Sequence, residues 1–261
     1  MKKSRVTKIR KELKKGTKTK NKTSKGKIIL LIMVFLVITI FSIYLVTQNK
    51  FVVKTVNVKG NTKYNLEEII KKTTCLNKNI FTISINDVEK NLKTYPYVEK
   101  AIMYKKIPNE IFITITERKP TYYVLNIKEN NIVILDKNGI ILESIPKDTF
   151  SYDTFLIQGI NFDDKIKYGE KINSVDLSKL AALENILNEY NIQKIDKKIT
   201  NIEFDSYKII LTLDEKIKVK IEDSKELEYK MRFLKKILYE IEDAPSEIDM
   251  TLDSPLYKKI A

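Results

Sequence analysis

The hydrophobic pattern begins with one long apolar run, from Ile28 to Val46. The run has nineteen residues and no charged side chain. At 1.5 Å per residue, a helix of this length spans roughly 28 Å, close to the ~30 Å hydrocarbon core of a bilayer. The alternative is a secretory signal, whose apolar region is shorter, at about 7–15 residues, and ends in a small-residue cleavage site. Because the run leaves through Thr47 to Phe51 without such a site, the pattern predicts an uncleaved transmembrane helix over 28–47.

The next patterns predict a strand and two short amphipathic helices. A Val-rich strand is expected over residues 51–59, ended by Gly60 in a turn with unusual φ. One helix should start at Asn65, and a second should run from about Ile85 to Tyr95. The expected apolar faces are Val52, Val56 and Val58 in the strand; Leu66, Ile69, Ile70 and Thr73 in the first helix; Val88, Leu92 and Tyr95 in the second.

Two extended runs follow, Val98 to Lys106 and Ile111 to Glu117, joined by a turn at Pro108. In the second run the isoleucines Ile111, Ile113 and Ile115 alternate with Phe112, Thr114 and Thr116, which is typical of a half-buried antiparallel pair. The order β-α-α-β-β predicts a three-stranded sheet covered by two helices. The free backbone of the second run, Ile111 to Thr116, is here the expected working surface, because exposed strand edges accept partner strands.

The rest of the chain, residues 120–257, predicts an antiparallel β domain with two helices. An Asp136–Gly139 turn should join two of its strands, and Ser224 should cap its last helix. Strands are expected at 122–127, 132–136, 140–142, 155–157, 199–204, 207–213, 216–221 and 247–252, and helices at 176–190 and from 224 onwards.

Charge is concentrated in the N-terminal tail. Residues 1–27 contain thirteen Lys or Arg and one acid, Glu12, a net +12. Subtracting this from the total of +14 leaves about +2 for residues 28–261. The tail is expected to be disordered, to stay in the cytoplasm and to touch anionic lipid. A nucleic-acid role is not expected, because the tail has no aromatic side chain on which bases could stack.

The residue types argue against catalysis. The chain has no histidine and one cysteine, Cys75, expected to be a small buried residue near a helix end. Without histidine the chain cannot form a Ser-His-Asp triad, a Cys-His pair or a His-ligated metal site. The adjacent carboxylates Glu67-Glu68 and Asp163-Asp164 are more typical of solvated surface, and Pro146 makes a Ser-Lys pair at Ser144 and Lys147 unfavourable. We expect no enzyme activity, catalytic residue, cofactor, metal or small-molecule substrate.

Residues 56–120 contain four short motifs. The most specific is Pro108-Asn109-x-Ile111-x-Ile113-x-Ile115-x-Glu117-Arg118-x-Pro120. The others are Val56-x-Val58-x-Gly60-Asn61, Asn79-Ile80-Phe81 and Tyr95-Pro96-Tyr97-Val98. Together they resemble the POTRA domain of the FtsQ family of cell-division proteins, called DivIB in Gram-positive bacteria. The expected class is therefore α+β: a basic tail (1–27), a transmembrane helix (28–47), a POTRA domain (51–119) and a β domain ending in a partner-binding strand (120–257).

The resemblance implies a divisome protein that binds partners of the FtsB/DivIC and FtsL type. In the family this contact lies on the strand after the last helix, so the expected contact residues here are Thr251, Leu252, Asp253, Ser254, Leu256 and Tyr257. Thr251 stands where the family has Arg, and Pro255 where it has Gly. In the rival interpretation, Ile248, Met250 and Leu252 simply complete the core.

Three functions follow as hypotheses. The first is a single-pass membrane scaffold of the divisome, with a cytoplasmic N-terminus, extracytoplasmic domains and enrichment at the septum. The second is a membrane-anchored POTRA adaptor or chaperone for exported polypeptides. The third, an envelope hydrolase, lacks a convincing set of acids.

Overall fold

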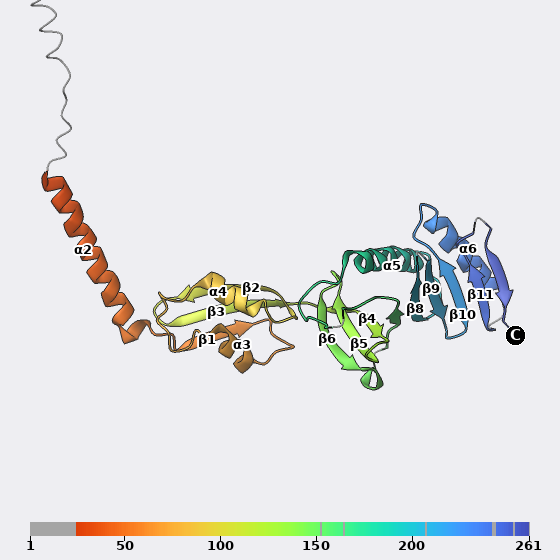
Figure 1. The fold of residues 1–261 in the computed structure, drawn as a ribbon, viewed down its shortest axis with the longest axis horizontal. Helices are drawn as coiled ribbons and strands as arrows, with labels where there is room; N and C mark the ends of the chain where they lie inside the picture. The colour runs from red at the N-terminus through yellow and green to blue at the C-terminus, as the bar shows by residue number, and fades with distance from the viewer. Residues whose placement is uncertain are drawn as a thin grey trace, which may run out of the picture.

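The computed structural model describes residues 25–151, 153–163, 165–206, 208–241, 244–252 and 254–260. Most of the tail predicted over residues 1–27 lies outside this range. Helix α2 (Lys25–Thr47), a small first sheet and a larger second sheet follow one another along the long axis of the molecule (Figure 1). The predicted α+β class is confirmed, with an N-terminal apolar helix, a β-α-α-β-β unit and a β-rich region with helices.

Helix α2 is apolar on all sides, and none of its membrane-length segment is buried inside the described part of the protein. Its segment Lys25–Leu45 is 21 residues long and 0% buried. A helix that is hydrophobic all round belongs either in a protein core or in a membrane. Helix α2 lies outside both sheets (Figure 1), so it is not a core helix. Its length and composition are those of a membrane-spanning helix.

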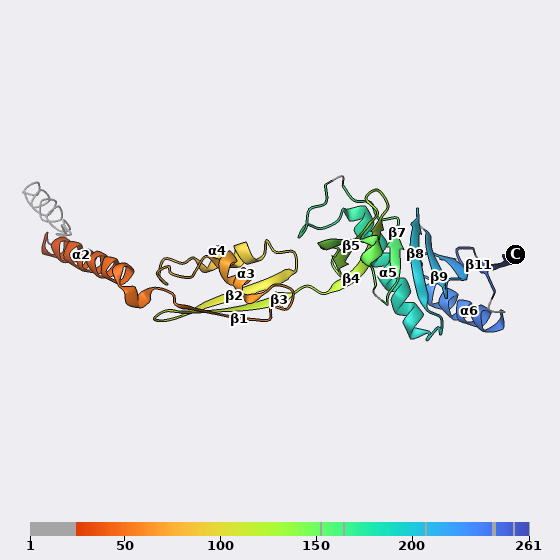
Figure 2. The ribbon, with the colours of Figure 1, turned by 90° about the horizontal axis from the view of Figure 1, so that it is seen from below.

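The first sheet contains β1 (Thr55–Lys59), β2 (Val98–Lys106) and β3 (Glu110–Glu117) in the order β1-β3-β2. Strand β1 is parallel to β3, and β2 is antiparallel to it. Helices α3 (Leu66–Thr73) and α4 (Ile85–Leu92) lie on the same side of the strands (Figure 2). The predicted hairpin and its alternation are confirmed, since Ile111, Ile113 and Ile115 are almost fully buried.

One prediction for this sheet is wrong. Strand β3 is central and is paired on both sides, so the backbone of Ile111 to Thr116 is not a free edge. The hydrophobic alternation shows only that one face of β3 is buried. It does not show that β1, which the two helices connect to the hairpin, pairs with β3 on the side opposite β2.

The start of the sheet also differs from the prediction. Strand β1 begins at Thr55, and the fully buried residue before it is Val53 in place of Val52. The shift follows from a 3-10 turn at Asn49–Phe51 and from backbone hydrogen bonds between Val53 and the 77–78 loop. In α3, Ile69 and Thr73 are buried as expected, but Leu66 in the first turn is 48% exposed.

The predicted helix start at Asn65 is confirmed, and α4 is capped as well. Asn65 caps α3 in a reciprocal capping box with Glu68, and Ser84 accepts a hydrogen bond from the Asp87 backbone N–H. Cys75 is fully buried as predicted, and burial raises the pKa of its thiol. Gly60 has φ +85°, and a Cβ there would lie 2.1 Å from the Ile115 carbonyl oxygen, so the turn requires glycine.

The second sheet has nine strands within the described residues, in the order β12-β11-β10-β9-β8-β7-β4-β5-β6. Three neighbouring pairs, β4 with β7, β7 with β8 and β10 with β11, are parallel, so the predicted antiparallel sheet is in fact mixed. The strands are β4 (Pro120–Asn126), β5 (Asn131–Asp136), β6 (Ile141–Pro146), β7 (Leu156–Gln158), β8 (Ile199–Asp205), β9 (Lys208–Leu213), β10 (Ile217–Ile221), β11 (Ser246–Asp249) and β12 (Leu256–Lys259).

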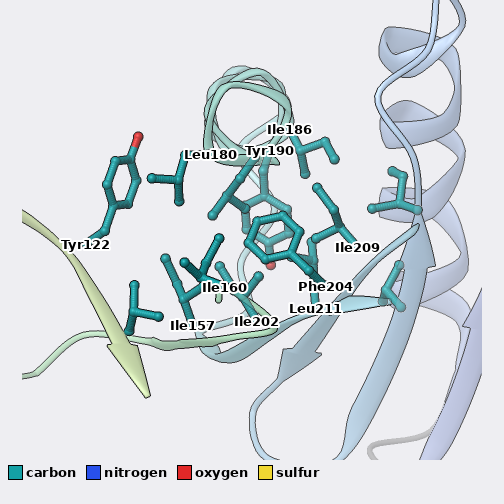
Figure 3. Packing of buried hydrophobic residues seen from close by; sticks show 14 of the residues in the cluster. Tyr122, Ile157, Ile160, Leu180, Ile186, Tyr190, Ile202, Phe204, Ile209 and Leu211 are labelled. Atoms are coloured by element: carbon teal, nitrogen blue, oxygen red, sulfur yellow. The ribbon is translucent and has the colours of Figure 1, made fainter. Parts of the chain in front are cut away.

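Helices α5 (Ser174–Ile192) and α6 (Leu227–Glu240) share one hydrophobic cluster with these strands. Figure 3 shows Leu180, Ile186 and Tyr190 of α5 directed at Ile157, Ile202, Phe204, Ile209 and Leu211. The predicted cap of α6 is wrong. Glu226 occupies the cap position, because the chain makes a turn from Ser224 to Leu227 first, and the buried Ser224 hydroxyl has no protein partner.

The two sheets are joined by a short polar junction. Glu143 on β6 accepts hydrogen bonds from the Lys63 ammonium at 2.8 Å and from the Tyr97 hydroxyl at 2.6 Å. Arg118 pairs with the buried Asp136 carboxylate at 2.8 Å. Around these contacts Tyr97, Ile134 and Leu142 form a small buried cluster. The Arg118 of the sequence motif therefore ties the two sheets together.

Candidate partner-binding site at the end of the second sheet

The last three strands build the end of the second sheet that lies farthest from α2 (Figure 1). Strand β11 is parallel to β10, and β12 is antiparallel to β11. The predicted closing strand 247–252 therefore stops at Asp249 and does not form an edge. Within the described residues the edge is β12, which pairs with β11 and with no other strand.

The segment between β11 and β12 is held by its own hydrogen bonds. The Met250 N–H donates to the Lys220 carbonyl at 2.8 Å, which extends the contact with β10 by one residue. The Asp249 carboxylate then accepts from the Thr251 N–H at 2.9 Å and from the Thr251 hydroxyl at 2.6 Å. This polar turn directs the chain back along β11.

Electrostatics stabilise the same turn. Partial burial acts to raise the pKa of Asp249, but the two Thr251 hydrogen bonds and the charges of Lys208 and Lys220 more than offset it, so the pKa lies below its ordinary value. Lys220 pairs with Glu247 of the neighbouring strand, and this hydrogen bond raises the pKa of Lys220. Asp249 therefore carries its charge at neutral pH and accepts both hydrogen bonds from Thr251.

The predicted contact residues are brought together, with different exposure. Ile248 and Met250 are fully buried in the core, whereas Leu252 is 48% exposed, so the rival interpretation is correct for the first two and wrong for Leu252. Leu256 and Tyr257 on β12 are 59% and 39% exposed. Ser254 is exposed, and Asp253 lies outside the described residues.

The register shows which backbone groups face outward. The Ile260 N–H donates to the Pro245 carbonyl at 2.9 Å, and the strands pair residue by residue from Ser246 with Lys259 to Asp249 with Leu256. In an antiparallel ladder, hydrogen-bonded pairs alternate with non-bonded pairs. The backbone N–H and C=O groups of Leu256 and Ile260 therefore face β11. The N–H and C=O of Tyr257 point away from the sheet. Pro255, which has no N–H, lies just before the strand.

This arrangement can accept an added strand. Unpaired N–H and C=O groups of an edge strand bind an extended segment, and neighbouring apolar side chains give the contact its specificity. Leu252, Leu256 and Tyr257 are exposed apolar side chains in and just before β12. The other edge of this sheet differs, because residues 169–171 make hydrogen bonds with β6 at Ile141 and a bridge at Ile140.

The sequence interpretation missed β12 as a strand. Its four residues, Leu-Tyr-Lys-Lys, show no alternation and are exposed on both faces. The sequence offered only a weak signal for this strand, the turn-forming residues Asp253-Ser254-Pro255 followed by Leu256 and Tyr257. Of the adjacent carboxylate pairs, Glu68 accepts the Asn65 N–H in its capping box, and Asp164 lies outside the described residues.

Comparison with known proteins gives consistent matches. Residues 51–118 match the POTRA domain, FtsQ-type, family. The chain is 30% identical over 211 residues to cell division protein DivIB of Clostridium tetani, covering 80% of this chain and 71% of the relative. It is 28% identical over 177 residues to DivIB of Clostridium botulinum (strain Hall), covering 67% and 65%. It is also 23% identical over 111 residues to cell division protein FtsQ of Koribacter versatilis, covering 40% and 31%.

Proposed function

The chain belongs to the DivIB/FtsQ family of cell division proteins, and we propose that it is a bitopic membrane scaffold of the bacterial divisome. In this role it links cytoplasmic and extracytoplasmic division proteins and regulates septum formation. It acts through protein contacts and not through catalysis. The single-pass helix α2, the POTRA domain and the family support this role.

The observation that carries the proposal is the edge strand β12, which among the described residues pairs only with β11. It lies at the end of the molecule opposite α2 (Figure 1), with exposed apolar side chains at Leu252, Leu256 and Tyr257. We propose that division proteins of the FtsB/DivIC and FtsL type add a strand there. The contact segment would be Thr251 to Tyr257, which includes Asp253 and Ser254.

The proposed topology follows from charge. The thirteen Lys and Arg of residues 1–27 favour a cytoplasmic N-terminus, where they would meet anionic lipid. The helix over 28–47 would then place a POTRA domain (51–119) and a β domain (120–257) outside the cytoplasm. Residues 1–24 lie outside the described part of the chain. We propose that the whole protein is enriched at the division septum.

The second candidate function is an adaptor for exported polypeptides that binds them along the first sheet. The observation that favours it is β2, one of the two edge strands of that sheet among the described residues. Its side chains Ile102 and Tyr104 are 45% and 53% exposed. Such an adaptor would bind many segments weakly and would not need β12.

Substitution of Tyr257 tests the first proposal. Tyr257→Pro removes the outward N–H, and proline is tolerated where an edge-strand N–H faces solvent. Tyr257→Ala is the matched control, because it keeps the N–H and loses the same ring. Full-length protein in detergent is titrated with its host's DivIC- and FtsL-type proteins. We expect Tyr257→Pro to weaken binding by roughly fivefold more than Tyr257→Ala, since a net backbone hydrogen bond contributes about 1 kcal/mol.

Localisation separates the two candidate functions. A fluorescent N-terminal fusion is expected to form a mid-cell band, and Leu252→Glu in the same fusion should weaken partner capture without unfolding the protein, since Leu252 is exposed. An even outline in dividing cells, with equal partner binding by Tyr257→Pro and Tyr257→Ala, would reject the scaffold proposal in favour of the adaptor.

A further inference from the structure

The connection between α2 and the first sheet is tightly bonded. The Val53 N–H donates to the Lys78 carbonyl at 2.9 Å, and the Ile80 N–H donates to the Phe51 carbonyl at 2.8 Å. The Asn79 side-chain amide also donates to the Leu45 carbonyl, in the last turns of α2, at 3.1 Å. The loop around Asn79 therefore contacts the membrane helix itself.

This contact places the loop close to the bilayer surface. The apolar segment Lys25–Leu45 has 21 residues and is about 32 Å long at 1.5 Å per residue, which fills a hydrocarbon core of ~30 Å. Leu45 then lies near the boundary of that core. The headgroup layer beyond it is about 5–7 Å thick on each side, so a group within hydrogen-bond distance of Leu45 lies in this layer.

The end of the first sheet that faces α2 exposes apolar side chains. Phe81 is 41% exposed and its ring lies 5.0 Å from the ring of Phe51, measured between centroids. Leu76 is 45% exposed and precedes the same loop. Ile107 is 62% exposed in the β2–β3 turn, which is next to the linker because Lys54 donates its N–H to Asn109. Exposed Phe and Leu side chains are typical of apolar faces that lie in the membrane interface.

The charge of this end is positive. The segments 48–54 and 74–82 contain Lys50, Lys54 and Lys78, all exposed, and no Asp or Glu. Nearby Lys106 pairs with Glu110 at 3.4 Å, so that pair adds no net charge. Lysines close to a bilayer are attracted to anionic headgroups. The surface thus combines apolar groups with uncompensated positive charge next to the membrane.

We propose that this juxtamembrane face, formed by Lys50, Phe51, Lys54, Leu76, Lys78, Phe81 and Ile107, docks on the bilayer through anionic phospholipid headgroups. Phe81 and Ile107 enter the headgroup layer, and the lysines bind the phosphates. The docked face fixes how the first sheet stands on the membrane. The inference rests on α2 crossing the bilayer and is independent of the partner proposed for β12.

A single tryptophan can test this docking, because the chain has none. Phe81→Trp in the full chain reports on the juxtamembrane face. Phe35→Trp, in the middle of α2, is the control for insertion, and Tyr239→Trp, at a residue 93% exposed on α6, is the control for solvent. Each protein is reconstituted in phosphatidylcholine vesicles with and without phosphatidylglycerol. Bromine-labelled acyl chains then quench any tryptophan that enters the membrane.

We expect strong quenching at position 35, clear quenching at position 81 with phosphatidylglycerol, and none at position 239. Adding Lys50→Glu and Lys78→Glu to Phe81→Trp should lower the quenching. The pair Lys137→Glu and Lys147→Glu makes the same change of charge on the β domain and should have no effect.

Three results would overturn the docking proposal. The first is quenching at position 81 no greater than at position 239. The second is quenching at position 81 that is unchanged by lipid charge and by the Lys50 and Lys78 substitutions, which would exclude anionic headgroups as the partner. The third is a lack of quenching at position 35, which would show that α2 does not cross the bilayer.

Discussion

The central strand of the first sheet and the edge strand of the second differ in how regular their hydrophobic pattern is. In the first sheet the clearest alternation is in β3, which is central and paired on both sides. In the second sheet the least regular strand is β12, which is exposed on both faces and lies at the edge among the described residues. Strong alternation arises from burial, so it identifies the core. In this chain the surface suited to a partner strand lies where the pattern is weakest.

Truncating one residue in each of the two strands should have very different effects. Ile113 on β3 is 1% exposed, and Ile113→Ala should lower the free energy of unfolding by about 2–5 kcal/mol through lost burial and a cavity. Leu256 on β12 is 59% exposed, and Leu256→Ala should change it by no more than about 0.5 kcal/mol. Urea unfolding in detergent measures both. Similar losses for the two variants would contradict the contrast between core and edge.

Glycine substitutions sharpen the same comparison between tightly packed and open sites. Gly60 and Gly169 have nearly equal φ, +85° and +84°. A Cβ at Gly60 would lie 2.1 Å from the Ile115 carbonyl, whereas at Gly169 the nearest atom is Cα of Pro96, at 3.8 Å. We expect Gly60→Ala to cost roughly 2–4 kcal/mol from the clash and the strained φ, and Gly169→Ala about 1 kcal/mol from φ alone. Thermal unfolding of the two proteins tests this, and equal shifts in Tm would be inconsistent with the close approach at Gly60.

The junction between the sheets should respond weakly to acid. Partial burial acts to raise the pKa of Glu143, but hydrogen bonds from Lys63 and Tyr97 and the Lys63 charge more than offset it, so the pKa lies below the ordinary 4.5. A lowered carboxylate pKa means that the stabilisation is present above pH 4.5 and is lost as the pH falls further through the folded-state value. The effect is small because the ion pair is partly solvated.

Glu143→Gln removes this titration. Its unfolding free energy should therefore fall less steeply than that of the wild type below pH 4.5. Glu129→Gln, at an exposed turn acid away from the junction, is the control. The assignment fails if Glu143→Gln and the wild type lose stability in parallel over that range.

Much of the fold was predictable because local signals agreed with the final structure. Asn65 gave the cap of α3, and Asp136 to Gly139 gave the turn before β6, where Asp136 accepts the Ile140 N–H at 2.8 Å. Strand order was not predictable, because it depends on which side of a hairpin a distant strand joins. The alternation in β3 would look the same with β1 on either side.

The sequence placed the candidate segment at the end of the β domain, but it did not reveal the local structure of that segment. Ile248 and Met250 alternate as a buried strand should, which located the end of the sheet. The pattern could not show that Asp249 and Thr251 form a turn directly afterwards, or that a four-residue strand returns beside β11. Edge strands bury little, so burial leaves almost no hydrophobic pattern in them.

Amide hydrogen exchange along the full chain, with and without the proposed DivIC- and FtsL-type partners, tests the central claim most directly. In the free protein the Tyr257 N–H, which points away from β11, should exchange quickly. With partners bound, the account predicts strong protection at Tyr257 and little change over β2, residues 98–106. Protection over β2 with unchanged exchange at Tyr257 would contradict the account and place the working edge on the first sheet.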